Sequence, residues 1–185
     1  MTTAEDEHHP LLPEWQVGTW LNTPHPLTLQ SLRGRVVLLH AFQMLCPGCV
    51  AYGLPQAQRV RQTFPATELA VIGLHTVFEH HAVMTVDALR AFVHEYRWRF
   101  PIGVDEPDGR GGASLTMARY GLRGTPSCLV LNQHGRVHLH HVGQIDDLVL
   151  GALLGRLIAG SALPSDANHA PKAEAAVCMP DGCRA

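Results

Sequence analysis

Hydrophobic positions along the chain form short runs and periodic patterns that predict alternating strands and helices. The runs at 36–42 and 69–74 are apolar almost throughout, which is typical of parallel strands covered on both faces. Apolar residues spaced three and four positions apart follow both runs, and this spacing predicts helices. The predicted strands are 17–21, 36–42, 69–74, 100–104, 128–131 and 136–142, and the predicted helices follow Cys49 or lie near 83–96, 113–120 and 146–160.

Several residues mark where the predicted helices begin, bend or end. Thr85 and Asp146 precede helical segments and are suited to N-caps, because their side-chain oxygens accept hydrogen bonds from free N–H groups. Gly121 and Gly160 follow helical segments, where glycine readily adopts the left-handed conformation. We expect Pro55 to kink the helix after Cys49, because proline lacks an N–H and crowds the preceding turn.

The order of elements from residue 36 onwards is β-α-β-α-β-α-β-β-α. Helical crossovers early in the chain and a hairpin late in it predict a mixed sheet with helices on both faces. We expect a mobile N-terminal arm over 1–16 and one domain over 17–160. Residues 161–185 are rich in Ala, Pro, Ser and Asn, and predict a flexible tail.

Composition narrows the classes of function. The chain has 185 residues, of which 46% are hydrophobic, and a formal net charge of −2, so nucleic acid is not an expected partner. No apolar run is long enough to span a membrane. Residues 1–10 lack the features of a secretory signal, so we expect a cytoplasmic protein, although a periplasmic protein whose leader had been removed would look the same.

The segment Cys46-Pro47-Gly48-Cys49 carries the strongest chemical signal. It lies between a predicted buried strand and a predicted helix. Free N–H groups and the positive end of the helix dipole stabilise a thiolate at Cys46, and the thiolate is the nucleophilic form of cysteine. Cytosolic thiols are kept reduced, so a C-x-x-C pair there favours a catalytic role over a structural disulfide.

In these features the chain resembles the thioredoxin fold, and more narrowly its redoxin branch of TlpA-like thiol-disulfide oxidoreductases. One shared feature is the segment 32–39 leading into the cysteine pair. A second is Tyr120-Gly-Leu-Arg-Gly-Thr-Pro126 followed by a strand, a turn and a strand. A third is an extra helix and strand between the second and third strands. The likeness spans about residues 17–160.

The resemblance implies an α/β fold, a thioredoxin-like three-layer α/β/α sandwich with a mixed central sheet and the extra helix-strand insertion. It implies that Pro126 is a cis-proline facing the active-site disulfide, where the residues alone favour an ordinary trans turn proline. The backbone of Thr125 and Pro126 would pair with an extended stretch of substrate beside Cys46. Pro47 and Gly48 would complete the substrate-binding surface.

The chemistry implied is thiol–disulfide exchange. Cys46 would attack a protein or small-molecule disulfide, and Cys49 would resolve the mixed disulfide. We expect Cys49 to be the more buried thiol, with the higher pKa. The reaction needs no cofactor, but it needs an electron donor, which the sequence does not identify.

His40 stands where thioredoxins carry a buried aspartate that helps to move the proton of the second thiol. An imidazole can act as a general base near neutral pH. The alternative is a core imidazole bonded to a backbone group. Leu45 also differs from the family, because it replaces the aromatic residue that usually precedes the first cysteine.

Three other functions remain open from the sequence. A peroxiredoxin-like peroxidase needs the motif P-x-x-x-T-x-x-C, but Leu39 and Gln43 occupy its proline and threonine positions. A Cys/His metal-binding module would draw on the cysteine pair and on histidines at 80, 81, 138 and 140, but we assign no metal ligands because the spacing fits no zinc motif. A redox-inactive structural domain is the third.

Four further residues have candidate roles. Cys178 and Cys183, in the predicted tail, are candidates for an auxiliary redox pair that relays electrons, for metal binding, or for no role at all. Cys128 lies in an apolar strand, and we expect a small buried hydrophobic residue. Glu79 follows a buried strand and either tunes Cys46 or is an ordinary solvated carboxylate.

Overall fold

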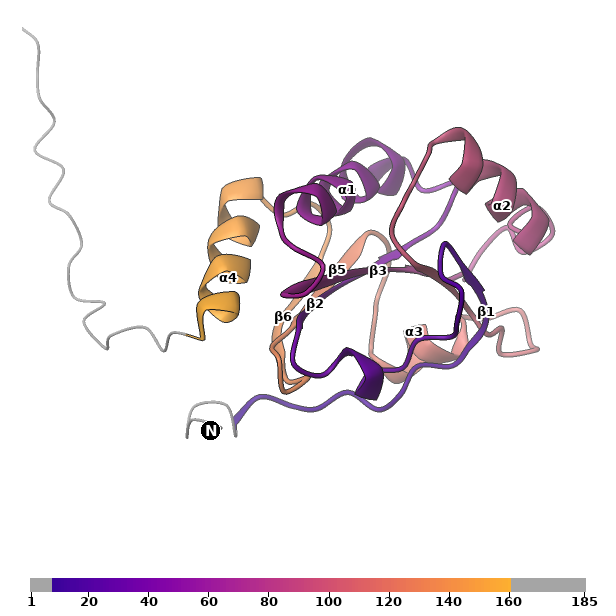
Figure 1. Ribbon diagram of the computed structural model, residues 1–185. Coiled ribbons are helices and arrows are strands. Elements are labelled where there is room, and N and C mark those ends of the chain that lie inside the picture. Colours follow the sequence, from indigo (N-terminus) through magenta and orange to yellow (C-terminus); the bar gives the residue numbers. More distant parts are fainter. Residues whose placement is uncertain (1–7, 161–185) are drawn as a thin grey trace, which may run out of the picture.

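A six-stranded mixed sheet forms the middle layer of the molecule (Figure 1). The computed structural model describes residues 8–160. The sheet order is β1-β4-β3-β2-β5-β6, with β2, β3 and β4 parallel to one another and the other pairs antiparallel. The strands are β1 Val17–Leu21, β2 Val36–Phe42, β3 Leu69–His75, β4 Ile102–Asp105, β5 Ser127–Leu131 and β6 Val137–Val142.

Helices cover both faces of the sheet, which confirms the predicted three-layer arrangement. Leu38 and Phe42 of β2 point to the face covered by α1, α2 and α4, whereas Leu39 and Ala41 point to the face covered by α3 and the N-terminal segment. Because β2 is buried on both faces, its sequence is apolar almost throughout. The helices are η2 Gln30–Leu32, η3 Cys49–Gly53, α1 Leu54–Thr63, α2 Val86–Glu95, α3 Leu115–Arg119 and α4 Asp147–Ala159.

The predicted extra helix and strand are observed as α2 and β4, which follow β3, the second of the two long apolar strands, and precede β5. β4 pairs with β3 on one side and with β1 on the other, so it widens the sheet. The Thr85 side chain caps α2 by accepting a hydrogen bond from the Ala88 N–H. The predicted boundaries of both elements differ from the observed ones by one to three residues, as is common at the ends of helices and strands.

The predicted hairpin and final helix are also observed. β5 and β6 pair antiparallel, and the Asp146 carboxylate accepts hydrogen bonds from two N–H groups at the start of α4. Gly160 ends α4 with a left-handed φ of 65°. No helix within residues 8–160 combines the length and the apolar character that a membrane span requires.

A π-helical turn, η3, precedes Pro55. In this turn the Leu54 N–H bonds to the Cys49 carbonyl, five residues back. Pro55 therefore falls in the first turn of α1, where a missing N–H leaves few hydrogen bonds unmade. The proline stands at a change of helix type, whereas the sequence predicted a kink within one helix.

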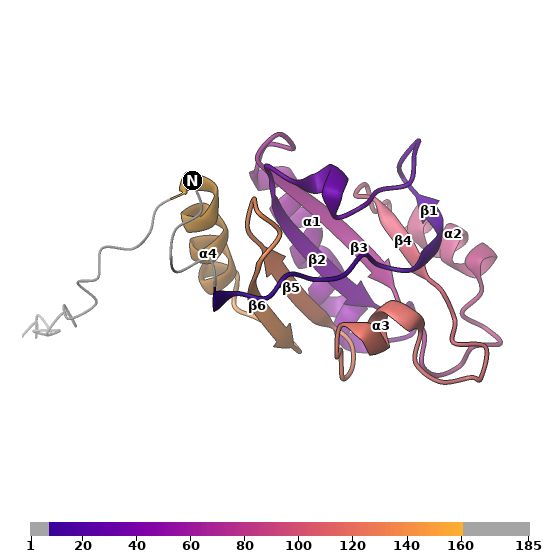
Figure 2. The ribbon, with the colours of Figure 1, turned by 90° about the horizontal axis from the view of Figure 1, so that it is seen from below.

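Residues 8–16 differ from the expected mobile arm, because they pack along the domain. Figure 2 shows this segment crossing the face of the sheet that carries α3. Trp15 is buried and donates a hydrogen bond to the Leu27 carbonyl, and the Tyr120 hydroxyl donates to the Pro13 carbonyl. The segment packs against the domain because this removes the apolar indole of Trp15 from water. Residues 1–7 of the arm and the predicted tail, with Cys178 and Cys183, lie outside the described residues.

The packing of this segment gives a stability test. Trp15→Ala should lower the free energy of unfolding by about 3 kcal/mol or more, because truncating a buried tryptophan removes its contacts and leaves a cavity. Leu11→Ala is the matched control, since this side chain is 52% exposed and should change stability by under about 0.5 kcal/mol. Equal effects in urea denaturation would contradict the packing of Trp15 in the core.

Candidate active site

The cysteine pair lies at the junction between β2 and the helix that follows it. Cys46 is partly exposed, whereas Cys49 is completely buried. Their sulfur atoms are 2.6 Å apart, and the Cys49 N–H donates to the Cys46 Sγ at 3.2 Å. One thiol therefore reaches solvent, and the other stands behind it within range of bond formation.

Burial controls the chemistry of Cys49. Burial, and then the neighbouring Cys46 side chain, raise the pKa of the Cys49 thiol to about 12. Hydrogen bonds from the Gln43 backbone and the Thr125 side chain partly oppose this increase. Cys49 is thus a neutral thiol at neutral pH. Its burial and its raised pKa confirm the expectation from the sequence.

The segment before β5 lies against the cysteines. The Thr125–Pro126 peptide bond is cis, as the resemblance implied. The Thr125 carbonyl accepts a hydrogen bond from the Cys46 thiol at 3.4 Å. A Cβ atom added to Gly48 would lie 3.2 Å from Pro126 Cδ, so Gly48 and Pro126 are close neighbours. The structure thus brings the predicted site residues of both segments together.

His40 lies deeper, on β2. Burial lowers the pKa of its imidazole to about 4, so the ring is neutral at neutral pH. The Cε1–Nε2 edge of the ring packs against Gly53, in the π-helical turn after the cysteines. Within the described residues, Nε2 has no hydrogen-bond partner. His40 is thus near the helix that carries Cys49, and its role as a proton acceptor stays a prediction.

Solved structures resemble this chain closely in fold and in sequence. The thioredoxin-like superfamily protein SPOA0173 is 52% identical, with a TM-score of 0.79, and the match covers 83% of this chain and 99% of that one. A thiol-disulfide isomerase from Corynebacterium glutamicum is 45% identical, also with a TM-score of 0.79, and the match covers 84% of this chain and 99% of that one.

The chain belongs to the thioredoxin-like superfamily. Protein DipZ of Mycobacterium tuberculosis is 42% identical over 59 residues, which are 31% of this chain. The same stretch is only 8% of DipZ, so the match spans a small part of that longer protein. No protein-family model matches the chain.

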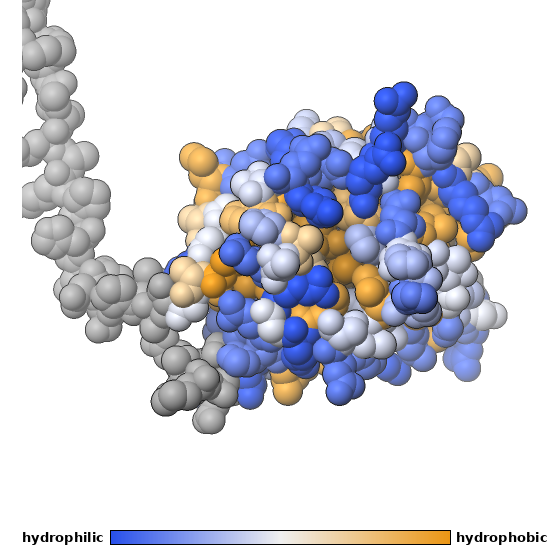
Figure 3. Space-filling view, viewed as in Figure 1, coloured by the Kyte–Doolittle hydropathy of each residue, from blue (hydrophilic) through white to orange (hydrophobic). Residues whose placement is uncertain are grey.

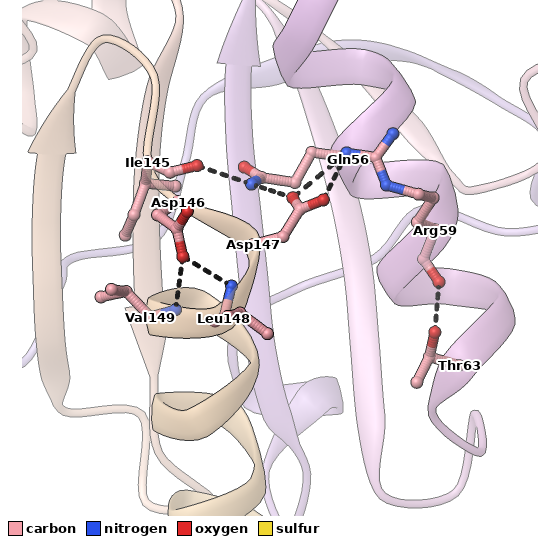
Figure 4. Close-up of polar contacts among 8 residues, drawn as sticks. All are labelled: Gln56, Arg59, Thr63, Ile145, Asp146, Asp147, Leu148 and Val149. Atoms are coloured by element: carbon pink, nitrogen blue, oxygen red, sulfur yellow. Dashed lines mark hydrogen bonds and ion pairs between the residues drawn. The ribbon is translucent and has the colours of Figure 1, made fainter. Parts of the chain in front are cut away.

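This thioredoxin-like domain has a pocket of about 250 Å3 beside the helix that follows the cysteine pair. His40, Gly53 and Cys128 line it, together with polar side chains of α1 and α4. Figure 4 shows Gln56 and Arg59 of α1 reaching Asp147 at the start of α4. The Gln56 Nε2 donates to the Asp147 carboxylate at 2.7 Å, and Arg59 pairs with it at 2.9 Å. These contacts join the active-site helix, which consists of η3 and α1, to α4.

The remaining candidate residues have different surroundings. Burial raises the pKa of the Cys128 thiol to about 12, which agrees with the expected small buried hydrophobic residue. Glu79 is exposed, and its carboxylate accepts a hydrogen bond from the Gln43 side chain at 3.4 Å. No three His, Cys, Asp or Glu side chains within residues 8–160 gather closely enough to hold a metal ion. The metal-binding interpretation therefore gains no support there.

The sequence analysis missed two residues of this thioredoxin-like site, Gly53 and Gln43. Gly53 leaves room for the His40 ring, and an isolated glycine within a helical pattern is a recognised sign of close packing. Gln43 is a polar residue between an apolar strand and the cysteines, and it is 1% exposed. The sequence signal for Gln43 was a polar residue directly after a long apolar strand and before the cysteine pair.

Gly53 gives a steric prediction. Gly53→Ala should destabilise the fold by about 1–3 kcal/mol, because the added methyl would overlap the buried His40 ring. Gly151→Ala, on α4, is the control. Its added methyl meets no atom within 4 Å, so higher helix propensity should raise stability by up to about 1 kcal/mol. Thermal unfolding of both variants measures this, and a neutral or stabilising Gly53→Ala would contradict the close packing.

The buried histidines predict a pH dependence of stability. Burial lowers the pKa of both His40 and His75 to about 4, from an ordinary value of 6.5. The unfolded chain therefore binds protons at a higher pH than the folded chain, and stability falls as pH decreases below about 7. At pH 5 the loss should be about 2 kcal/mol for each imidazole.

Urea denaturation between pH 8 and 5 measures this loss. His40→Asn should remove about half of the pH dependence, whereas His25→Asn, at an exposed position, should leave it unchanged. A wild-type protein with constant stability across this range would contradict the burial of neutral imidazoles.

Proposed function

We propose that this protein is a thiol-disulfide oxidoreductase that reduces or exchanges protein disulfides through Cys46 and Cys49. The observation that carries the proposal is the asymmetry of the pair, with one partly exposed sulfur 2.6 Å from a fully buried one. The 45% identity to a thiol-disulfide isomerase over nearly all of that chain supports the same reaction type.

The proposed reaction has two exchange steps. The Cys46 thiolate attacks one sulfur of the substrate disulfide, a mixed disulfide forms, and the other substrate sulfur leaves as a thiolate. Cys49 then loses its proton and attacks the Cys46 sulfur. This step releases the second substrate thiolate and leaves a Cys46–Cys49 disulfide. Two electrons have passed to the substrate, and a separate electron donor must reduce the pair before the next cycle.

The second step needs a proton acceptor, because the pKa of Cys49 is raised to about 12. We propose His40 for this role. Its imidazole is neutral at neutral pH and can accept a proton, but a pKa of about 4 makes it a weak base that would hold this proton only transiently. It also packs against the helix that carries Cys49. Contact with the departing proton would require a water-mediated path or a small movement of the ring, as often holds before substrate binds.

The proposed substrate surface surrounds Cys46. Thr125 and Pro126 would pair with an extended stretch of substrate backbone, and Pro47 and Gly48 would contact it from the helix side. Leu45, next to the nucleophile, is 57% exposed. Figure 3 shows hydrophilic residues over much of one molecular face, with hydrophobic residues visible between them. An exposed leucine beside the reacting sulfur favours substrates with an apolar residue near the disulfide.

Substitution of each cysteine separates the two steps. Cys46→Ser should abolish reduction of insulin disulfides by dithiothreitol-recycled protein, because it removes the nucleophile. Cys49→Ser should instead accumulate a mixed disulfide at Cys46, because the resolving thiol is missing. Non-reducing electrophoresis and mass spectrometry detect this product. Cys128→Ala is the control and should retain most activity, since this thiol is buried and unreactive.

These measurements also distinguish the proposed oxidoreductase from the alternative functions. Disulfide reduction that persists in Cys46→Ser would contradict the proposed nucleophile. Rapid consumption of hydrogen peroxide by wild-type protein, with no activity on insulin, would favour a peroxidase. If oxidised and reduced glutathione at varied ratios never produced a Cys46–Cys49 disulfide, the oxidoreductase proposal would fail.

A further inference from the structure

Gln43 contacts more of the active site than its position in the sequence suggests. It is the first residue after β2, three residues before Cys46, and its side chain is 99% buried. A buried amide loses its hydrogen bonds to water, so it must find partners within the protein. Its side chain and its backbone have different partners.

The Gln43 side chain binds the segment that follows β3. Its Oε1 accepts a hydrogen bond from the Phe78 N–H at 3.3 Å, and its Nε2 donates to the Glu79 carboxylate at 3.4 Å. β2 and β3 are parallel neighbours, so the segments after them start at the same edge of the sheet. The amide therefore ties residue 43 to the adjacent loop.

That loop is itself fixed from its far side. The Val77 N–H donates to the Ser114 hydroxyl at 3.1 Å, and the same hydroxyl donates to the Val77 carbonyl at 2.9 Å. At the near side, the Thr76 N–H donates to the Phe42 carbonyl at 3.1 Å. Phe78 and Glu79 thus follow an anchored backbone, which gives the Gln43 amide defined partners.

The Gln43 backbone acts on both cysteines. Its carbonyl accepts a hydrogen bond from the Cys46 N–H at 3.3 Å. The Gln43 backbone also lowers the pKa of the Cys49 thiol, against the effect of burial. The position of this one residue therefore affects the nucleophile and the resolving thiol together.

We propose that Gln43 is a positioning residue for the cysteine pair: its side chain, held by Phe78 and Glu79, fixes the backbone carbonyl that accepts the hydrogen bond of the Cys46 N–H. The inference rests on the proposed function and deepens it. Glu79 then acts indirectly, as the exposed end of the same hydrogen-bonded chain. A backbone that lowers the pKa of Cys49 favours its thiolate, which exists only in the reduced pair, so the same contact stabilises the reduced state.

The test is a redox titration of the full chain in glutathione buffers, with the Cys46–Cys49 disulfide quantified by thiol alkylation and mass spectrometry. Gln43→Met keeps the length of the side chain and removes its hydrogen bonds. It should shift the ratio of disulfide to dithiol by about threefold or more towards the disulfide, because the reduced pair loses stabilisation. Gln62→Met, at an exposed position of α1, should titrate like wild type.

Glu79 supplies a second, independent arm. Glu79→Ala removes the partner of the Gln43 amide at an exposed position, so the variant should fold even if Gln43→Met does not. It should shift the ratio in the same direction. Glu79→Gln keeps an acceptor oxygen and should restore the wild-type ratio, which a purely electrostatic role of the carboxylate would not allow. The effects of Gln43→Met and Glu79→Ala should not add, because Gln43→Met already removes the hydrogen bond that Glu79→Ala breaks.

The pH profile of Cys49 gives a further readout. In a Cys46→Ser background, the rate of Cys49 alkylation should rise at a higher pH in Gln43→Met than in the matched Gln43 protein. Wild-type titration behaviour in both Gln43→Met and Glu79→Ala would overturn the inference while leaving the oxidoreductase proposal intact. Failure of wild-type protein to form the disulfide would overturn both.

Discussion

The active site depends on the burial of β2 between two neighbouring strands. β3 pairs with it in parallel, and β5 pairs with it antiparallel. The parallel neighbour brings the segment after β3 beside the residues that follow β2. The antiparallel neighbour brings the segment before β5, with Thr125 and Pro126, to the same edge. Because successive side chains of a strand point to opposite faces, a shift of register by one residue would place His40 and its neighbours on the wrong side of the sheet.

The difference between the two cysteines follows from this placement. The helix begins at the surface end of β2, so its first turn has one exposed side and one side that faces the core. Cys46 lies on the first and Cys49 on the second. Burial alone would make Cys49 unreactive, and hydrogen bonds from Gln43 and Thr125 partly offset it. The site therefore combines a partly exposed sulfur with a buried one whose reactivity its neighbours determine.

Support for the site extends to the opposite face of the sheet. Residues 8–16 pack there against α3, and Ser114, at the N-terminus of α3, holds the loop that binds Gln43. On the helical face, Asp147 joins α4 to the active-site helix through Gln56 and Arg59. The cysteine pair is thus positioned by elements from both layers, and this explains why much of the chain is needed to build a four-residue motif.

The sequence by itself determined the elements and the main site residues. Continuous apolar runs predicted β2 and β3, helical spacing predicted α2, and caps at Thr85, Asp146 and Gly160 were predicted from local hydrogen-bonding chemistry. Cys46 and Cys49 were found because C-x-x-C at a strand-to-helix junction is a local pattern. Such features depend on residues close together in the chain, so they can be read without the fold.

Only the tertiary structure decided the relations between distant segments. These relations join residues 12 to 36 positions apart: the packing of Trp15, the contact of Gly53 with His40, and the hydrogen bonds between the Gln43 side chain and Phe78 and Glu79. Local propensity carries no information about such pairs, because the partners are set by strand register and by which faces become buried. For the same reason, a role for Gln43 could be proposed only once its hydrogen-bond partners after β3 were known.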